Sequence, residues 1–380
     1  RQLERSDWDS IAETQADEID TLFQDDVVAS LLAAEAPTGA DASSISDARS
    51  YAARIAFEAL RAGYETGFEA GLANDARLFG KVVAQARAAE AGGFDTVLVM
   101  DHFYQLPMLG PPENEMLECY TTLAALAAST ESIQLSALVT GNTYRNPAML
   151  AKTVTTLDIV SAGRAILGIG AGWFELEHEG YGFEFGTFSD RFVRLEESLQ
   201  IIKPMLQGQR PSFDGQWYRA KDAINEPRVR DDLPIMIGGS GEKKTFRLAA
   251  LFADEVNIIC GADELPRKLD ALAARCEEVG RDRSTVHTTW HGAVILGRTM
   301  DEAVGVRDGY LAERGLDWAT AEPMMGQRMV VGDPDAVAEQ LQAKALDPGV
   351  DGLTINLPGN GHDPEIVALA GEALAPLVGR

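Results

Sequence analysis

Cysteine is scarce in this sequence, and its cysteines stand apart from one another. There are three, Cys119, Cys260 and Cys276, with no CxxC pair and no spacing typical of a zinc site. We therefore expect buried or half-buried thiols in a reducing compartment and no bound metal. No apolar run reaches the roughly 18 residues that a membrane-spanning helix needs. The charged first residues lack the apolar centre of a signal peptide, so we expect a cytoplasmic protein.

Positive charge is also in short supply. Lys and Arg together number 33, against 59 Asp and Glu, and the formal net charge is -26. Nucleic acids and anionic membranes are bound by basic surfaces that displace counterions. The balance of charge therefore argues against both kinds of partner. An anionic small molecule would have to be held by a local cluster of donors.

The chain changes character near residue 78. The first part, residues 1–78, is rich in alanine and acidic residues and shows no convincing strand. Some of its apolar residues recur at helical spacing, namely Phe57, Leu60, Tyr64 and Phe68. We expect an atypical helical N-terminal segment, followed by a second unit over residues 79–380.

That second unit alternates short strands with longer amphipathic helices. Strands are expected over residues 96–100, 133–140, 165–169, 234–237, 256–259, 285–296 and 352–357. Helices are expected over residues 79–91, 119–129, 147–161, 191–206, 242–252, 264–279 and 365–377. This alternation predicts a parallel sheet covered by helices, as in a TIM (β/α)8-type barrel. Such a barrel needs eight strands, and residues 27–32 either supply the missing first strand or form a helix.

In such a barrel, the active site lies where the strands end. Asp101 and His102 directly follow the first visible strand. His102 is therefore a candidate proton donor or acceptor that Asp101 can orient, and a purely structural histidine is the alternative. The next strand ends in Thr140 and Gly141, where glycine permits the close approach of a ligand. Arg145 either binds an anion or pairs with a carboxylate.

Three glycines gather at the end of the third visible strand. Residues 168–172 carry them and run into Trp173, which offers a stacking wall for a flat ring. No helix is expected directly after them, so the run is not a dinucleotide fingerprint. Glu175, Glu177 and His178 follow, either as acids and bases or as a solvated polar face.

A glycine-rich turn is the clearest anion site. It consists of Gly238, Gly239, Ser240 and Gly241, between a strand and a helix expected to begin near Glu242. Free N–H groups at a helix N-terminus bind phosphate, and glycines let the phosphate approach. Three basic residues nearby add local positive charge, namely Lys243, Lys244 and Arg247.

Taken together, these pieces resemble the luciferase-like flavin and deazaflavin oxidoreductases, and most closely the branch that uses coenzyme F-420. The stretches that carry the resemblance are AQARAAEAGGFDTVLVMDHFYQLPMLGPPENEMLECYTTLAALA, LVTGNTYRNPAMLAKTVTTLDIVSAGRAILGIGAGWFELEHEGYGFEF, RFVRLEESLQIIKPML, PIMIGGSGEKKTFRLAALFADEVNI and DGLTINLPGNGHDPE. The resemblance covers roughly residues 79–378. It implies a luciferase-like barrel and a homodimer.

The resemblance also implies roles for single residues. His102, beside Asp101, corresponds to the usual catalytic histidine next to the cofactor ring. Ala137 and Leu138 fall where relatives carry a non-prolyl cis peptide against that ring. Further cofactor contacts are expected at Thr140, Gly141, Ala171, Gly172 and Trp173. The turn from Gly238 to Gly241 matches the loop that holds the cofactor phosphate.

The N-terminus departs from the family pattern. Family members open with a strand of the kind FGLFIP, which is absent here. The stretch GFEAGLANDARLFGKVVA instead resembles the C-terminal helical tail of crotonase (enoyl-CoA hydratase-like) enzymes. Residues 1–78 are therefore expected to be a fused or exchanged segment.

The function implied by the resemblance is hydride transfer between a reduced deazaflavin and a small organic substrate. His102 would give or take the proton, and Glu177 and His178 are further catalytic candidates. One alternative is an FMN-dependent luciferase-like monooxygenase that activates oxygen. Others are a flavin- or deazaflavin-binding protein without turnover and a crotonase-type acyl-CoA protein, the last suggested by the N-terminal tail alone.

Overall fold

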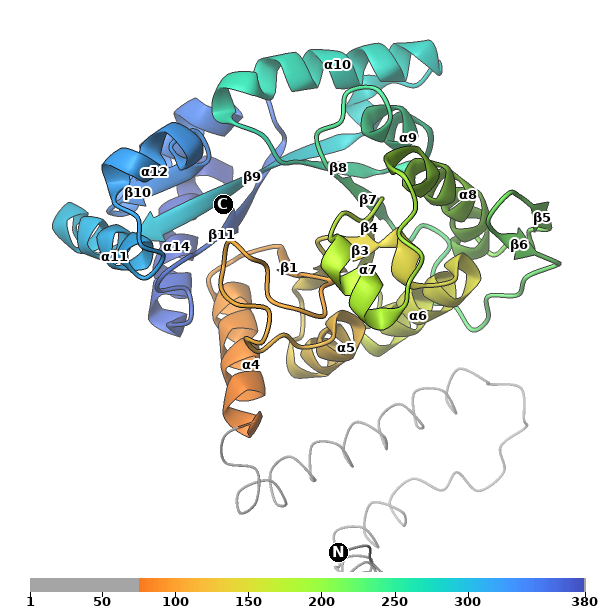
Figure 1. The fold of residues 1–380 in the computed structure, drawn as a ribbon, viewed down its shortest axis with the longest axis horizontal. Coiled ribbons are helices and arrows are strands. Elements are labelled where there is room, and N and C mark those ends of the chain that lie inside the picture. Colours follow the sequence, from red (N-terminus) through yellow and green to blue (C-terminus); the bar gives the residue numbers. More distant parts are fainter. Residues whose placement is uncertain (1–74, 379–380) are drawn as a thin grey trace, which may run out of the picture. The chain divides into compact units, whose positions relative to one another are not determined.

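The computed structural model describes residues 75–378, which form a curled parallel sheet with helices on its outer side (Figure 1). The predicted N-terminal segment, including residues 27–32, lies outside the described residues. The predicted boundary at residue 79 falls inside a helix, because α4 spans Asp75–Ala91.

Seven strands form the wall of the sheet. They are β1 (Thr96–Val99), β2 (Gln134–Ala137), β4 (Ala165–Gly170), β7 (Ile235–Gly238), β8 (Glu255–Ile258), β9 (His287–Leu296) and β11 (Gly352–Asn356). Neighbours pair in that order, and every pair is parallel. Each strand lies where the sequence predicted one, so the parallel α/β architecture is confirmed.

Helices return the chain between these strands. They are α4, α5 (Cys119–Ser129), α6 (Pro147–Val160), α8 (Phe188–Leu206), α9 (Thr245–Phe252), α10 (Leu265–Glu278) and α14 (Pro364–Leu374). Their starts are set by local capping: Asn146 caps α6 just before Pro147, and Thr187 forms a capping box with Asp190 at α8. Helix α9 begins at Thr245, later than predicted, because residues 242–244 form a turn.

Several further elements were not predicted from the sequence. The strands are β3 (Thr140–Gly141), β10 (Met329–Gly332) and the hairpin of β5 (Phe213–Asp214) and β6 (Arg219–Ala220). The helices are α7 (Glu175–Tyr181), α11 (Met300–Ala312), α12 (Trp318–Met325) and α13 (Pro334–Leu341). Short 3-10 turns lie at Asn142–Tyr144, Ala262–Glu264, Arg283–Thr285 and Ala375–Val378, and a π turn lies at Gln342–Leu346. The expectation that no helix follows the glycines near Trp173 is wrong, since α7 begins at Glu175.

The predicted cis peptide lies one residue further along the chain. The bond between Leu138 and Val139 is cis, and the bond between Ala137 and Leu138 is not among the cis bonds of the described residues. Ala137 still pairs with Val99 in the ladder of β2 and β1, so the chain leaves the strand only after it. The Val139 side chain occupies the space that a Cβ on Gly170 or Gly238 would need. These two glycines are therefore required by packing of the protein itself.

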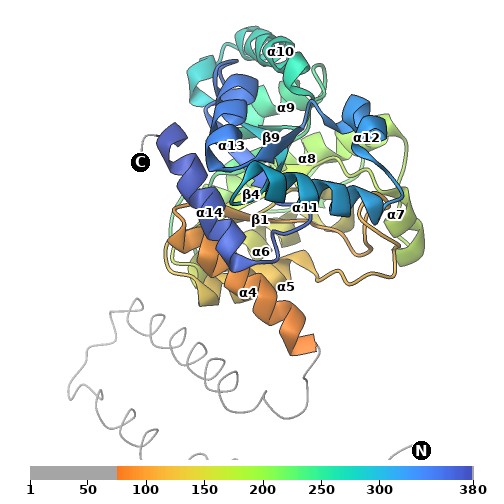
Figure 2. The same ribbon diagram turned by 90° about the vertical axis from the view of Figure 1, so that its left-hand side faces the viewer.

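Helices α4 and α14 lie side by side on the outside of the sheet (Figure 2). A Cβ on Gly371 of α14 would lie 2.3 Å from the carbonyl oxygen of Gly92, just after α4. The close approach of the two backbones thus depends on a glycine.

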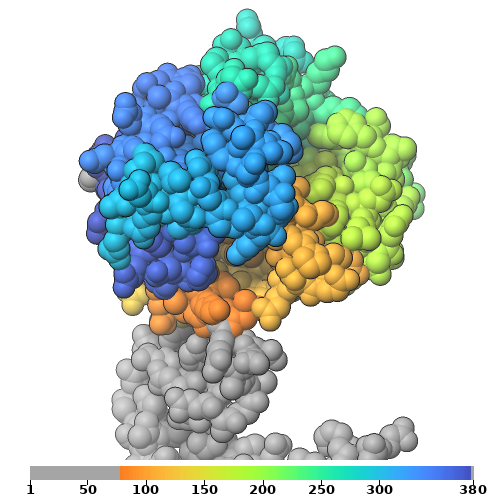
Figure 3. All heavy atoms as spheres, turned by 60° about the vertical axis from the view of Figure 1, so that its left-hand side comes forward, coloured from red at the N-terminus to blue at the C-terminus, as the bar shows by residue number. Residues whose placement is uncertain are grey.

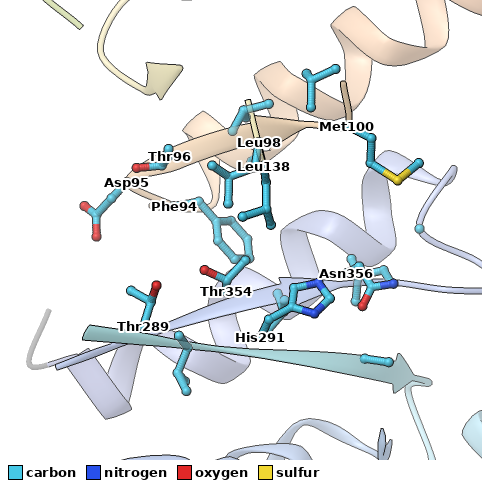
Figure 4. A pocket seen from close by; sticks show the side chains of 18 of the residues that line it. Phe94, Asp95, Thr96, Leu98, Met100, Leu138, Thr289, His291, Thr354 and Asn356 are labelled. Atoms are coloured by element: carbon cyan, nitrogen blue, oxygen red, sulfur yellow. The ribbon is translucent and has the colours of Figure 1, made fainter. Parts of the chain in front are cut away.

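The sheet has two free ends within the described residues. No pairing joins β1 to β11, which are the first and last strands of the row. The space between them carries side chains from both sides, including Phe94 and Leu98 near β1 and Thr354 on β11 (Figure 4). The described sheet has nine strands, counting the short β3 and β10, and none of them bridges β1 and β11.

Three further expectations concern the whole described part. Cys119, Cys260 and Cys276 are buried free thiols, as predicted. No helix among the described residues is both long and apolar enough to cross a membrane. No group of three or more His, Cys, Asp or Glu side chains in residues 75–378 is arranged to hold a metal ion.

Candidate functional site

A cavity of about 2040 Å³ runs along the inside of the curled sheet. Its wall includes His102 and Trp173 at the carboxyl ends of the strands and Gln134 and His287 at their amino ends. In the space-filling view the surface is hollowed between the segment around α12, drawn in blue, and the segments drawn in orange and yellow-green (Figure 3). The volume exceeds the roughly 300–1,000 Å³ of a usual small-molecule pocket, partly because it includes the space between β1 and β11.

His102 is held by a buried carboxylate. Its Nδ1 lies 2.9 Å from Oε2 of Glu177, whose side chain is 0% exposed. The two residues come from different elements, the end of β1 and helix α7, so only the fold brings them together. Glu177 as an ionised carboxylate can only accept, so Nδ1 of His102 carries the proton. The other ring nitrogen, Nε2, is then the group that can exchange a proton with a ligand.

Glu177 receives more hydrogen bonds than the one from His102. The hydroxyl of Tyr144 donates to Oε2 at 2.6 Å, and the backbone N–H groups of Phe103 and Tyr104 donate to Oε1. Burial alone would raise the pKa of Glu177, but these bonds and that from His102 lower it below its usual value. Burial and the bond to Glu177 raise the pKa of Tyr144 well above its usual value. Glu177 therefore stays ionised beside His102 at neutral pH.

Asp101 is tied into the scaffold. Its carboxylate accepts two bonds from Arg145, at 2.6 and 2.9 Å, and one from the backbone N–H of Gly141 at 3.0 Å. Arg145 also pairs with Glu118 at 2.8 Å. Of the two interpretations of Arg145, pairing with carboxylates is therefore the one the structure bears out. The sequence predicted that Asp101 orients His102. Within the described residues, the carboxylate that is hydrogen-bonded to the ring of His102 is that of Glu177.

His178 is buried and has both ring nitrogens engaged. Nδ1 lies 2.8 Å from the carbonyl oxygen of Phe174, and Nε2 lies 2.7 Å from the hydroxyl of Thr143. Burial lowers its pKa. This arrangement favours a role in holding α7 in place, and a catalytic role stays a prediction. Glu177 and His178 do not form the solvated face that the sequence left open, because both are fully buried.

The expected cofactor contacts divide into two groups. Leu138 and Trp173 line the cavity, and the indole of Trp173 is 53% exposed, with its ring centre 5.6 Å from that of His102. Thr140 and Gly141 are buried, and the hydroxyl of Thr140 lies 2.6 Å from that of Tyr120. Ala137 is also buried, whereas Ala171 and Gly172 are half-buried beside Trp173.

The glycine-rich turn lies at the end of β7, as predicted, but the basic residues near it differ in part from those expected. The N–H of Gly239 already donates to the carbonyl of Asn257, while Ser240 and Gly241 continue the turn. Arg247 pairs with Glu196 rather than facing the turn. A cation that contacts the turn was not predicted: Nζ of Lys268, on α10, donates to the carbonyl of Ser240 at 3.0 Å.

Other residues near the cavity also escaped sequence reasoning. Tyr144 supports Glu177, and Arg328 and His291 line the cavity across from His102. Tyr144 stands in an unpredicted 3-10 turn and Arg328 in an unpredicted region. Of these residues, only His291 could have been identified as a candidate from the sequence, because it lies inside a predicted strand.

A flat ring with a phosphate-bearing side chain fits this arrangement. The exposed face of Trp173 offers a stacking surface at the wall of a cavity large enough for such a ring. His102 and Leu138 lie on the same wall. Residues 238–240 are half-buried and Gly241 is exposed at the end of β7, so a phosphate can reach the backbone of this turn.

Comparison with known proteins agrees with this geometry. Residues 60–352 match the family model described as luciferase-like monooxygenase. The chain is 30% identical over 339 residues to an F420-dependent glucose-6-phosphate dehydrogenase of Microbacterium testaceum, covering 83% of this chain and 97% of that protein.

Two solved structures illustrate the likeness of fold. The coenzyme F420 dependent tetrahydromethanopterin reductase of Methanopyrus kandleri has a TM-score of 0.64 and 19% identity, with 79% of this chain and 96% of that chain covered. The EDTA monooxygenase of Chelativorans sp. has a TM-score of 0.66 and 16% identity, with 82% and 89% covered.

Proposed function

Because the chain belongs to the luciferase-like monooxygenase family, we propose that it is an oxidoreductase that uses the deazaflavin coenzyme F-420 and acts on a small organic molecule. The observation that carries the proposal is the His102–Glu177 pair at the wall of the cavity, beside the exposed face of Trp173. The curated relative at 30% identity is F420-dependent, which favours the deazaflavin over FMN.

Several residues would hold the coenzyme. Trp173 and Leu138 would contact the ring, with Ala171 and Gly172 beside them. The turn at 238–241 would bind the phosphate through its backbone N–H groups. Thr140 and Gly141, which are buried, would support this wall from behind. When bound, the coenzyme supplies hydride chemistry, and the protein supplies position and electrostatics.

His102 would move the proton that accompanies this chemistry. With Nδ1–H fixed on Glu177, the neutral ring offers Nε2 as an acceptor, and the protonated ring offers Nε2–H as a donor. The carboxylate of Glu177 stabilises the protonated ring and fixes its orientation. Glu177 therefore acts through His102, as a positioning residue.

The site needs a complete wall. Seven strands of the described sheet form its wall in parallel order, and a further strand between β1 and β11 would close the TIM (β/α)8-type barrel. We include that closed barrel in the proposal. The division into an N-terminal segment of 1–78 and a barrel unit of 79–380, the cytoplasmic location and the homodimer stay predictions.

A second candidate function is that of an FMN-dependent monooxygenase. It is favoured by the fold likeness to a monooxygenase at a TM-score of 0.66, similar to that of the F420-dependent reductase. Fold likeness at this identity does not decide between the two cofactors.

Replacing His102 by Ala tests the proposed function. Turnover with reduced coenzyme F-420 should fall by about 10²–10⁴-fold, because general acid–base catalysis contributes that much. Coenzyme binding, measured by fluorescence titration, should stay within a few-fold of the unmodified chain. Equal turnover in the variant would overturn the role of His102, and a lack of turnover in the unmodified chain would favour a binding protein.

A further inference from the structure

A second cavity, of about 440 Å³, lies among helices α11, α12 and α13, strand β10 and the π turn at Gln342–Leu346. Figure 1 shows α11, α12 and β10 close together, on the left of the view. The volume falls within the roughly 300–1,000 Å³ of a usual small-molecule pocket. Among the described residues that line it, Met329 alone also lines the first cavity, so the two cavities are neighbouring but separate.

The lining of this second cavity is rich in positive charge for this chain. Arg307 and Lys344 line it, and its one carboxyl residue in the described part is Glu322, which is exposed. The first cavity has the opposite balance, because its described lining contains more Asp and Glu than Lys and Arg. In a chain with a net charge of -26, a local excess of cations marks a place where an anion can be held.

Lys344 is a half-buried cation in an unusual piece of backbone. It stands in the π turn, and such turns occur frequently at functional sites. Its Nζ donates to the carbonyl oxygens of Gly326 and Met329, at 2.8 and 2.9 Å, which leaves one of its three donors for a ligand. Burial lowers the pKa of Lys344, and no carboxylate of the described residues pairs with it. A ligand anion would neutralise this charge.

Arg307 supplies a second group of donors. Its side chain is 16% exposed, and its guanidinium centre lies 4.8 Å from the centre of the Trp318 ring. Nε and Nη2 both lie within 2.9 Å of Oδ1 of the neighbouring Asp308, which is exposed and does not line the cavity. Nη1 has no hydrogen-bond partner in the part of the chain that the structure describes. The N–H groups of Nη1 can therefore bind an anion.

We propose that Arg307 and Lys344 bind one small organic anion in the second cavity. Guanidinium and ammonium donors suit the oxygens of a carboxylate or a phosphate. The anion would join α11 to the π turn and lie against α12, since Trp318, Glu322 and Pro323 of α12 also line the cavity. This site lies outside the cavity of the proposed function and does not depend on it.

An anion in this place would hold helix α12. The helix buries a single residue, Ala321, so few contacts of its own keep it in position. Met324 and Met325 of the same helix line the first cavity. An anion that steadies α12 therefore also acts on the wall of the first cavity.

Titration of the full chain with simple probes tests the site. Succinate, inorganic phosphate and the uncharged succinamide are titrated by calorimetry. The tighter of the two anions should bind at least tenfold more tightly than succinamide, and it identifies the bound group as a carboxylate or a phosphate. With that anion at saturation, amide hydrogen exchange in residues 318–325 should slow at least fivefold.

Variants in the lining locate the anion. Arg307→Gln should weaken its binding at least tenfold, and Arg307→Lys should retain part of the affinity, because the charge stays while the planar set of donors is lost. Glu322→Gln should strengthen binding a few-fold, because it removes a negative charge from the lining. Two controls should leave binding unchanged: Arg298→Gln, at a surface arginine paired with Glu365, and Arg328→Gln, in the first cavity.

Thermal unfolding without ligand checks that each variant is folded, and the exposed Glu322→Gln carries the test if Arg307→Gln is not. Equal binding of the anions and succinamide, or unchanged binding in folded Arg307→Gln, would overturn the proposal. Loss of binding in Arg328→Gln would place the anion in the first cavity and overturn it equally. Unchanged hydrogen exchange in α12 at saturation would do the same.

Discussion

Glu177 is the residue on which the candidate site is organised. It has no exposure to solvent and accepts hydrogen bonds from His102, from Tyr144 and from two backbone N–H groups. Removing its charge would weaken the hydrogen bond to His102 without removing any group that lines the cavity. The sequence placed His102 just after a strand, as the structure does, because the end of a strand is a local feature. Glu177 was predicted as a catalytic candidate, but its contact with His102 was not, because that contact depends on how α7 folds back over β1.

Replacing Glu177 by Gln tests this positioning role. An amide retains the shape but offers one acceptor oxygen and no charge, so it holds the ring of His102 less firmly. We expect kcat to fall by about tenfold or more and KM to change little. Steady-state kinetics at neutral pH would measure both. An unchanged kcat would contradict the positioning role.

His291 predicts a specific acid sensitivity. Its folded-state pKa of about 4 lies below the ordinary value of 6.5, so the unfolded chain binds more protons between these two values. The free energy of unfolding should therefore fall as the pH drops from 6.5 to 4, by up to about 3 kcal/mol from this group. His291→Gln should flatten that part of the curve in urea unfolding. His362→Gln, at an exposed histidine, should not, and identical slopes for all three proteins would refute the assignment.

At the scale of elements, the sequence predicted those strands and helices that a clear pattern of apolar residues marks. Six of the seven wall strands are short, and β4 is buried along its whole length, as is common in a parallel sheet. The region 297–351 was missed because its signal is weak. Helix α11 buries three residues, Ala303, Tyr310 and Leu311, and carries two glycines, so no apolar stripe marks it. The break between β2 and β3 was also missed, since a turn within an apolar run leaves no pattern.

Two helix glycines should respond oppositely to alanine. Gly371→Ala would place its Cβ 2.3 Å from the Gly92 carbonyl oxygen and should cost about 1–3 kcal/mol, because α14 must move away from α4. Gly305→Ala, at an exposed position of α11 with nothing within 4 Å, should stabilise by about 0.5–1 kcal/mol. Denaturant unfolding measures both. Stabilisation by Gly371→Ala would mean that the two helices are not packed as described.

At the scale of the whole molecule, the charge of -26 and the family set the remaining expectations. Composition argued against two classes of partner but could not identify the ligand, which depends on side chains from distant elements meeting at one cavity. The resemblance identified the family correctly. Which side chains face the cavity, Arg328 above all, could not be predicted without the fold.

The predicted homodimer is open to a direct check. Light scattering on the purified chain should give twice its 40.9 kDa at micromolar concentration. A mass of 40.9 kDa that persists at higher concentration would contradict the expectation.

The central claim is tested most directly by titrating the full chain with oxidised coenzyme F-420 and, separately, with FMN, following fluorescence or heat. The account predicts saturable binding of F-420 that is at least tenfold tighter than that of FMN, and weaker F-420 binding after Trp173→Ala. A preference for FMN would move the protein to the monooxygenase alternative, and binding of neither would contradict the proposed function for this chain.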